Sequence, residues 1–313
     1  MGHAYSSLRC LQYGRGAPFS RALTSGEEGP LHEARHSWHR RAAATDTAAG
    51  RRSALTVAGS VRLREQSRGQ GAAATRSLEG GTGETLVSLH GAGGLNPDPA
   101  LELLAAQFHV FAPELPGFGS SIEQPLASFE EVAGQVVGML DAHGVERCTL
   151  VGTSFGAIVA LHIALTEANR LDALVLLSPA APRPAGWTPP IDIDRALFAN
   201  PSGPRPDAVA PELAERQHAL VGRLLEGLDE DRLRARLPAI EVPTLVVCGT
   251  EDGLFGPEQG RVYRELMPNC SFVLLYDAAH ELGWDRPEAL AALIGDFATR
   301  RETFVVGVAE SRA

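Results

Sequence analysis

The sequence contains no lysine, because all 28 of its basic residues are arginine. A pyridoxal enzyme holds its cofactor through a Schiff-base lysine, so this class is excluded. The P-loop motif needs a lysine that reaches the nucleotide phosphates, so P-loop enzymes are excluded as well. The absence of one residue type therefore removes two large classes of enzyme.

Cysteine is scarce, and none of the four cysteines lies at CxxC spacing from another. Zinc sites and disulfide frameworks use short, regular spacings, so neither is expected, and no metal or cofactor is predicted. Cys148 and Cys248 lie in apolar runs that are typical of strands. We expect buried free thiols and a reducing, cytoplasmic environment.

The sequence also lacks a convincing membrane span. Residues 148–166 carry no formal charge, but Gly152, Thr153, Ser154 and His162 interrupt the apolar run. A strand, a sharp turn and a buried helix account for this segment better than a helix in contact with lipid.

Positive charge is scarce in most of the chain. Residues 81–313 contain 16 arginines against 32 acidic residues, although residues 1–80 contain 12 arginines against 6. Nucleic-acid binding needs a positive field, so the acidic body makes a nucleic-acid partner unexpected.

Residues 1–53 show no sustained periodicity and few apolar residues. This composition predicts a disordered N-terminal tail. A transit peptide that targets an organelle is an alternative, because the segment is rich in arginine and poor in acids. The first residues also fit a loose myristoylation pattern, whereas no apolar region of secretory type is present.

From about residue 54 the sequence alternates between short apolar runs and helical patterns. This alternation predicts an α/β fold with a mostly parallel, doubly wound sheet. The predicted strands are residues 54–63, 74–79, 86–89, 108–112, 148–151, 173–177, 244–248 and 272–276, and the predicted helices are residues 129–143, 157–166 and 287–300.

Residues 180–238 break the alternation and are named the insertion below. They contain nine prolines, eight of them between residues 182 and 211, and helical patterns follow near 211–226 and 229–236. About sixty residues between two strands are too many for a simple loop. We therefore predict that residues 54–179 and 239–313 form the core and that the insertion forms a helical cap over it.

Gly152-Thr153-Ser154-Phe155-Gly156 is a G-x-S-x-G pentapeptide between a predicted strand and a predicted helix. In this context the serine sits on a strained turn that exposes its hydroxyl, and the glycines leave room for the turn. Ser154 is therefore the predicted nucleophile. The alternative is a serine that merely caps an ordinary helix.

A serine nucleophile needs a base and an acid that orients it, here in the order serine, acid, histidine. Asp252 follows the strand at 244–248, and His280 follows the strand at 272–276. Both lie beyond the carboxyl ends of strands, where open α/β sheets bind ligands. Asp252 is the predicted acid, with Glu251 as the alternative, and His280 is the predicted base.

His90-Gly91-Ala92-Gly93-Gly94, named the glycine loop below, follows the predicted strand at 86–89. Its small residues let backbone amides approach a substrate. The N–H groups of Ala92 and Phe155 are the predicted oxyanion hole, with Gly93 as the alternative to Ala92. We expect a structural role for His90.

Five blocks in order resemble the α/β-hydrolase superfamily, in its capped esterase and carbon–carbon hydrolase branch. They are LVSLHGAGG, PELPGFGSS, LVGTSFGAIVAL, IEVPTLVVCGTEDGLFGPEQ and AAHELGWDRPEALAALIGDF. The resemblance covers about residues 54–300 and implies Ser154, Asp252 and His280 as the catalytic triad. A serine at the nucleophile position differs from the dehalogenase and epoxide hydrolase branches. Ala279 stands where the family commonly has glycine before the histidine.

The expected function is hydrolysis of a small or medium, largely apolar ester, thioester, lactone or activated carbon–carbon substrate through an acyl-enzyme. A lyase or cofactor-free oxygenase on the same fold and a non-catalytic binding protein are the alternatives, since one fold hosts many functions. The apolar expectation rests on large side chains of the insertion, which would line a pocket if they do not all pack internally. They are Trp187, Ile191, Ile193, Leu197, Phe198, Leu213, Leu220, Leu224 and Leu225.

Overall fold

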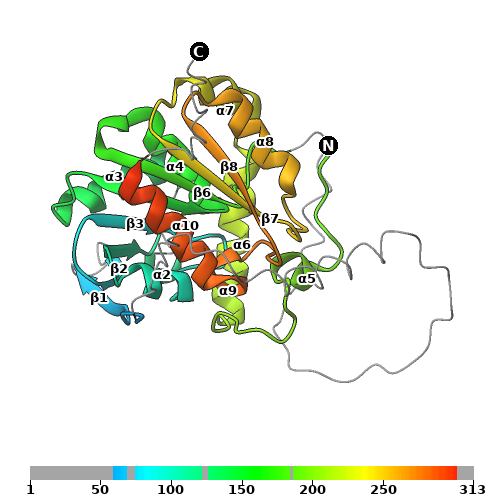
Figure 1. Cartoon of the computed structure of the whole chain (residues 1–313). Helices are drawn as coiled ribbons and strands as arrows, with labels where there is room; N and C mark the ends of the chain where they lie inside the picture. Colours follow the sequence, from blue (N-terminus) through cyan, green and yellow to red (C-terminus); the bar gives the residue numbers. More distant parts are fainter. Residues whose placement is uncertain (1–58, 69–74, 122–125, 184–185, 302–313) are drawn as a thin grey trace, which may run out of the picture. The chain divides into compact units, whose positions relative to one another are not determined.

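An eight-stranded sheet in the order β1-β2-β4-β3-β5-β6-β7-β8 forms the centre of this computed structural model (Figure 1). The structure describes residues 59–68, 75–121, 126–183 and 186–301. Strands β3 to β8 are parallel, whereas β2 pairs antiparallel with β1 and with β4. The predicted mostly parallel α/β sheet is confirmed. The strands are β1 Arg64–Arg68, β2 Thr75–Gly80, β3 Thr85–Leu89, β4 His109–Pro113, β5 Cys148–Thr153, β6 Leu171–Leu177, β7 Thr244–Gly249 and β8 Cys270–Leu275.

Helices cover both faces of the sheet, and Figure 1 shows α10 crossing in front of it. Helices α2 and α10 pack on one face, and α3, α4 and α8 pack on the other. The helices are α2 Pro99–Leu104, α3 Phe129–Ala142, α4 Phe155–Thr166, α5 Ile193–Leu197, α6 Pro211–Glu226, α7 Glu230–Arg236, α8 Pro257–Leu266, α9 Leu282–Asp285 and α10 Pro287–Arg300, with short 3-10 turns at Gly119–Ser121, Ala168–Arg170 and Leu237–Ala239.

Strand β6 shows why these strands are continuously apolar. Val175 and Leu177 belong to the core on the α2–α10 face, whereas Leu174 and Leu176 belong to the core on the α4 face. Successive side chains of a strand point to opposite faces, so a sheet covered on both faces needs apolar residues at every position. This burial fixes the carboxyl ends of β5, β7 and β8, where the predicted site residues lie.

The first strand lies later in the chain than predicted. The strand predicted at residues 54–63 is wrong where the structure describes it: residues 59–63 are not in a strand, and β1 comes after them. Residues 54–58, like the predicted tail at 1–53, lie outside the described residues. The sequence of β1 is REQSR, which has no apolar period. As an edge strand, β1 is held by backbone pairing with β2. Its side chains therefore need not show the apolar pattern from which a strand is predicted.

The cysteines agree with the prediction of buried free thiols. Cys148, Cys248 and Cys270 are free and buried, and burial raises the pKa of each thiol to about 12. Cys10 lies outside the described residues. Among the helices that the structure describes, none is long and apolar enough to cross a membrane.

The insertion between β6 and β7 contains helices α5, α6 and α7. Helices α6 and α7 lie close to the predicted helical stretches, whereas α5 was not predicted. Helix α6 buries one stripe, formed by Gln217, Leu220 and Leu224, at the i, i+3, i+7 spacing of a single helix face. Leu220 packs against Gly117, and Leu126 lies against the same glycine. Burying such a leucine contributes about 1.5–3 kcal/mol, so this stripe holds α6 on the core.

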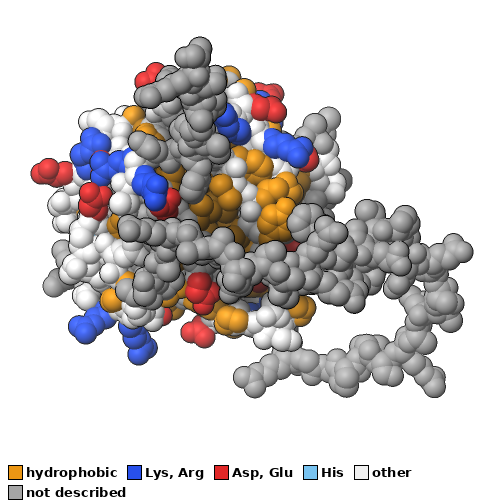
Figure 2. Space-filling model, viewed as in Figure 1, with side chains coloured by type: hydrophobic (Ala, Val, Ile, Leu, Met, Phe, Trp, Pro, Cys, Tyr) orange, Lys and Arg blue, Asp and Glu red, His pale blue; other side chains and the backbone are white. Residues whose placement is uncertain are grey.

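Charged side chains are mixed on the face of the molecule shown in Figure 2. Arginine and acidic side chains of the described residues are interspersed around its edge, and hydrophobic side chains lie nearer its middle. Charge of one sign is therefore not concentrated on this face.

Candidate active site

Ser154 lies at a strained turn between β5 and α4. Its backbone has φ 53° and ψ −110°, a conformation that residues with a Cβ rarely adopt. The flanking glycines are required sterically. A Cβ on Gly152 would meet the backbone of Gly156 and Ala157, and a Cβ on Gly156 would meet the carbonyl oxygen of Leu89.

The turn does not serve to cap the helix. Although Ser154 precedes the first residue of α4, its side chain makes no capping hydrogen bond, so the alternative of an ordinary N-cap is wrong. Backbone strain of this kind costs about 1–3 kcal/mol and is concentrated at functional sites. The N–H of Ser154 donates to the carbonyl oxygen of Leu177 at 2.8 Å, which ties the turn to β6.

Asp252 and His280 form a buried pair beyond the ends of β7 and β8. The Nδ1 of His280 lies 3.1 Å from Oδ2 of Asp252, and the two side chains are 3% and 0% exposed. The other carboxylate oxygen, Oδ1, accepts the N–H groups of Leu254 and Phe255, each at 2.9 Å. These bonds fix Asp252 so that it can hold the Nδ1–H tautomer of His280 and leave Nε2 free to accept a proton.

The pKa of His280 reflects two opposed effects. Burial alone lowers the pKa of this imidazole, but the charge of Asp252 and its hydrogen bond raise it, and Glu281 acts in the same direction. The result is a pKa above the ordinary value of histidine. Glu251, the alternative acid, is exposed, and its N–H donates to the carbonyl oxygen of Ala278, whereas Asp252 is bonded to the histidine.

The glycine loop lies against the Ser154 turn. A Cβ on Gly91 would lie 3.4 Å from Cβ of Ser154, and the N–H of Gly94 donates to the carbonyl oxygen of Gly91 at 3.2 Å. His90 anchors the loop, since its Nε2 accepts the N–H of Leu115 at 2.9 Å and its Nδ1 lies 2.8 Å from the carbonyl oxygen of Gly91. Both ring nitrogens are therefore used, and burial lowers the pKa of His90 to about 4. This is a structural role.

The predicted oxyanion donors follow the two residues that lie against each other: Phe155 follows Ser154, and Ala92 follows Gly91. Phe155 is the first residue of α4, so its N–H has no acceptor within the helix. Ala92 and Gly93 form the tip of the glycine loop, where Ala92 is half-buried and Gly93 is exposed. Burial favours Ala92 over Gly93 as the second donor.

The structure brings some of the predicted site residues together and leaves one contact unmade. Asp252 is bonded to His280, and Ser154 contacts the glycine loop. Among the hydrogen bonds of the described residues, none joins Ser154 to His280. Nucleophile–base hydrogen bonds are often long without a bound substrate and tighten when the substrate binds.

Asp285 was not identified from the sequence, although it lies five residues after His280. Its Oδ2 accepts the N–H of Ala279 at 2.8 Å and the N–H of Ala199 at 2.9 Å, and its Oδ1 accepts the N–H of Asn200 at 3.4 Å. One carboxylate thus holds the backbone beside His280 and a segment of the insertion. The sequence signal was weak, because an aspartate before Arg-Pro is equally typical of a helix start.

We expect Asp285→Ala to lower kcat for ester hydrolysis about tenfold, because each lost hydrogen bond to a charged group is worth about 1.5–3 kcal/mol and His280 would lose its fixed position. Asp285→Asn keeps one acceptor oxygen and should recover part of the loss. Glu288→Ala, an exposed acid nearby, is the control. Wild-type kinetics in Asp285→Ala would contradict a positioning role.

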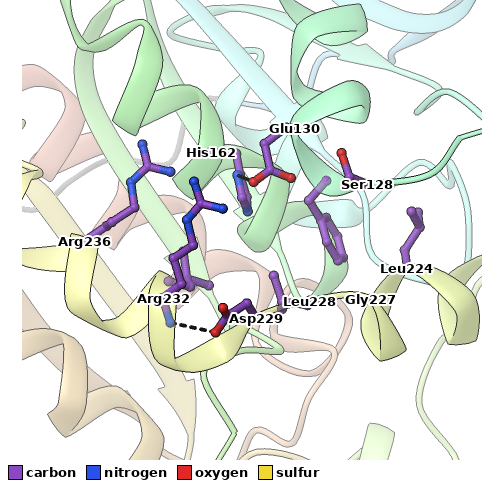
Figure 3. A pocket seen from close by; sticks show the side chains of 11 residues that line it. Ser128, Glu130, His162, Leu224, Gly227, Leu228, Asp229, Arg232 and Arg236 are labelled. Atoms are coloured by element: carbon purple, nitrogen blue, oxygen red, sulfur yellow. Dashed lines mark hydrogen bonds and ion pairs between the residues drawn. The ribbon is translucent and has the colours of Figure 1, made fainter.

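A separate cavity of about 180 Å³ lies among α3, α4 and the α6–α7 junction (Figure 3). Nδ1 of His162 lies 3.6 Å from the carboxylate of Glu130, and the side chains of Arg232 and Arg236 reach toward His162. Burial lowers the pKa of His162, and the two arginines oppose the effect of Glu130. None of the predicted site residues lines this cavity. Its lining residues are Ser128, Phe129, Glu130, His162, Leu224, Gly227, Leu228, Asp229, Arg232, Leu233 and Arg236.

Metal ligands are not clustered in the part of the chain that the structure describes. No group of three or more His, Cys, Asp and Glu side chains there could hold a metal ion.

Known proteins resemble this chain over most of its described length. A pimeloyl-(acyl-carrier protein) methyl ester esterase of Vibrio cholerae is 28% identical over 251 residues, which cover 70% of this chain and 96% of that protein. A 2-hydroxy-6-oxo-6-phenylhexa-2,4-dienoate hydrolase of Burkholderia cepacia is 26% identical over 257 residues, with 70% and 89% covered. A 2-succinyl-6-hydroxy-2,4-cyclohexadiene-1-carboxylate synthase of Serratia proteamaculans is 26% identical, with 72% and 97% covered.

Solved structures give the same fold. A 2-hydroxy-6-oxo-6-phenylhexa-2,4-dienoate hydrolase from Rhodococcus sp. strain RHA1 superposes with a TM-score of 0.65 at 21% identity, and the match covers 77% of this chain and 99% of that one. The model of the alpha/beta hydrolase family matches residues 86–293. This chain therefore belongs to the alpha/beta hydrolase family.

Proposed function

We propose that this protein is a serine hydrolase in which Ser154, His280 and Asp252 act as a catalytic triad. The observation that carries the proposal is the buried His280–Asp252 hydrogen bond, at the same edge of the sheet as the strained Ser154 turn. A non-catalytic binding protein has no need of a buried charged pair beside a strained serine. Burying such groups is costly unless they are paired, so their retention favours catalysis.

In the proposed reaction the hydroxyl of Ser154 attacks the acyl carbon while Nε2 of His280 takes its proton. Asp252 holds the ring and stabilises the imidazolium that forms. The imidazolium then gives the proton to the leaving alcohol, and the acyl group stays on Ser154 as an ester. Water, deprotonated by His280, attacks this acyl-enzyme and releases the acid and free Ser154.

The N–H groups of Phe155 and Ala92 are proposed to bind the oxygen that becomes negative during each attack. Phe155 offers an N–H at the start of α4, and Gly91, which precedes Ala92 in the glycine loop, lies against Ser154. Fixed donors of this kind stabilise the transition state by several kcal/mol, about 2.7–4 for one donor.

We also propose that the insertion at residues 180–238 acts as a cap over this site. Trp187 stacks on Phe255 with ring centroids 5.5 Å apart, and Phe255 in turn lies 5.6 Å from the ring of His280. The N–H of Gly253 donates to the carbonyl oxygen of Ala196 in α5 at 3.3 Å. The insertion thus touches the loop that carries Asp252, which supports a role in closing the pocket.

A fluorophosphonate probe tests the serine chemistry directly. We expect the probe to label the wild-type protein at Ser154 and not to label Ser154→Ala, as read by mass spectrometry of the labelled peptide. Labelling at another serine, or at none, would argue against the assignment of the nucleophile.

The proposed substrate has a small or medium, largely apolar acyl group. The buried Phe255 lies beside His280, and the half-buried Trp187 stacks on Phe255. Large apolar side chains favour apolar ligands. Among p-nitrophenyl esters we expect kcat/KM to be highest between acetate and hexanoate and to fall for long, lipid-like chains. A dianionic or polymeric substrate that is preferred by several orders of magnitude would contradict an enclosed apolar pocket.

Cleavage of a carbon–carbon bond is the second candidate function, because one relative at 26% identity is a 2-hydroxy-6-oxo-6-phenylhexa-2,4-dienoate hydrolase. The same triad could perform either reaction. Product analysis distinguishes them: an ester releases an alcohol and an acid, whereas carbon–carbon cleavage splits the substrate skeleton itself.

A further inference from the structure

Gln217 is the polar member of the buried stripe of α6. It is 4% exposed, and the other two residues of the stripe are Leu220 and Leu224. Leucine at this position would be favoured by burial and by helix propensity alone. An amide in an otherwise leucine stripe therefore needs a separate explanation.

The amide of Gln217 has no hydrogen-bond partner in the part of the chain that the structure describes. Among the described residues, neither its Oε1 nor its Nε2 takes part in a hydrogen bond, although a buried amide without partners costs about 1–3 kcal/mol. Within the described ranges, three other polar atoms without partners are fully enclosed by protein, namely those of His162, Ser178 and Gln259. The atoms of Gln217 are not among them, so its amide is not fully enclosed and water can reach it.

The amide of Gln217 lies close to the glycine loop of the candidate active site. A Cβ on Gly94 would lie 3.6 Å from Nε2 of Gln217 and 3.7 Å from its Oε1. Gly94 closes the turn of the glycine loop, whose Gly91 lies against Ser154. Gln217 therefore faces the same short loop that carries the proposed oxyanion donor Ala92.

We propose that Gln217 is a specificity-determining residue whose amide binds an oxygen atom, as a carbonyl or a hydroxyl, in the acyl part of the substrate. This inference rests on the proposed function of the Ser154 site and narrows its substrate class. The proposed substrate has an otherwise apolar acyl chain with one uncharged carbonyl or hydroxyl group. This group is several bonds away from the bond that is cleaved.

The chemistry of the amide explains why the group is neutral and polar. Its N–H₂ donates to a carbonyl oxygen, and its Oε1 accepts from a hydroxyl. The rest of the stripe is leucine, so an ionised group at this place would be poorly compensated. A purely apolar chain would leave the amide without a partner when the site closes. Sites that bond a substrate oxygen discriminate strongly against analogues that lack it.

The test compares pairs of esters of equal length in the wild-type protein and in Gln217→Leu. The pairs are the p-nitrophenyl esters of 4-oxopentanoate and pentanoate, of 5-oxohexanoate and hexanoate, and of 6-oxoheptanoate and heptanoate. We expect the wild type to prefer the oxo ester in at least one pair. Gln217→Leu should lower that preference about tenfold, the loss expected for one hydrogen bond, while the plain ester is hydrolysed as before or faster.

Two controls separate specificity from structure. His218→Leu introduces the same side chain at an exposed neighbouring position and should leave the preference unchanged. The Tm of Gln217→Leu should equal or exceed that of the wild type, because the variant buries leucine in place of an unpaired amide. A role in folding alone would instead lower Tm and reduce the rates for both esters of a pair alike.

The failure of this inference differs from the failure of the proposed function. If Ser154-dependent hydrolysis is present but the oxo-to-plain ratio is the same in the wild type and in Gln217→Leu for every pair, the inference about Gln217 is wrong. If no ester is hydrolysed in a Ser154-dependent manner, the proposed function is wrong and the inference falls with it.

Discussion

Ser154→Ala should lower kcat for ester hydrolysis by at least about a thousandfold, since loss of a triad serine removes the covalent route. The effect should lie in kcat and not in KM, because the hydroxyl attacks but contributes little to substrate binding. Folding should be preserved. Alanine fits the left-handed backbone no worse than serine, and the serine side chain makes no capping hydrogen bond that would be lost.

Ser178→Ala is the matched control. Ser178 follows β6 and, like Ser154, has a positive φ, here 42°. Its buried hydroxyl has no hydrogen-bond partner among the described residues. Its loss should leave kcat within a few-fold of the wild type. The assignment of the nucleophile would be overturned if Ser154→Ala kept more than about a tenth of the wild-type rate.

The sequence predicted the parts of the molecule that local physics determines. A continuously apolar strand followed by G-x-S-x-G leaves few other conformations, and the structure places Ser154 in the strained turn that this pattern requires. The alternation of short apolar runs with helical patterns likewise predicted a mostly parallel sheet. Asp252 was preferred over Glu251 on position alone, and the hydrogen bond to His280 now favours it.

The parts that the sequence did not predict depend on distant contacts. Strand β1 is polar and is held by the backbone of β2, so no period in its own residues reveals it. Asp285 acts on the backbone of Ala199, which lies 86 residues away along the chain. The significance of Gln217 depends on the approach of Gly94, from a different segment. Such relations appear only when the chain is folded.

The second large effect is expected from Asp252→Asn, which should lower kcat/KM by about 10³–10⁴. The substituted asparagine would keep the size of the side chain, and its oxygen could still accept the N–H groups of Leu254 and Phe255. Its amide N–H₂ would then face Nδ1 of His280 and favour the tautomer with the proton on Nε2. That tautomer cannot accept the proton of Ser154.

The pH dependence of the same variant has a definite sign. In the wild type, the pKa of His280 is raised by Asp252 against the effect of burial, so kcat/KM should rise with pH through an inflection above about 6.5. Without the carboxylate charge, burial acts with less opposition and lowers the pKa of His280. The inflection of the residual activity should therefore move to lower pH.

The measurement is kcat/KM for p-nitrophenyl butanoate between about pH 5 and 9, on the wild type, Asp252→Asn and a control. Asp277→Asn serves as the control, because Asp277 is an exposed acid in the loop that carries His280 and pairs only with Arg286 among the described residues. It should change neither the rate nor the inflection appreciably. An inflection that stays in place, or moves to higher pH, in Asp252→Asn would show that Asp252 does not set the pKa of the catalytic base.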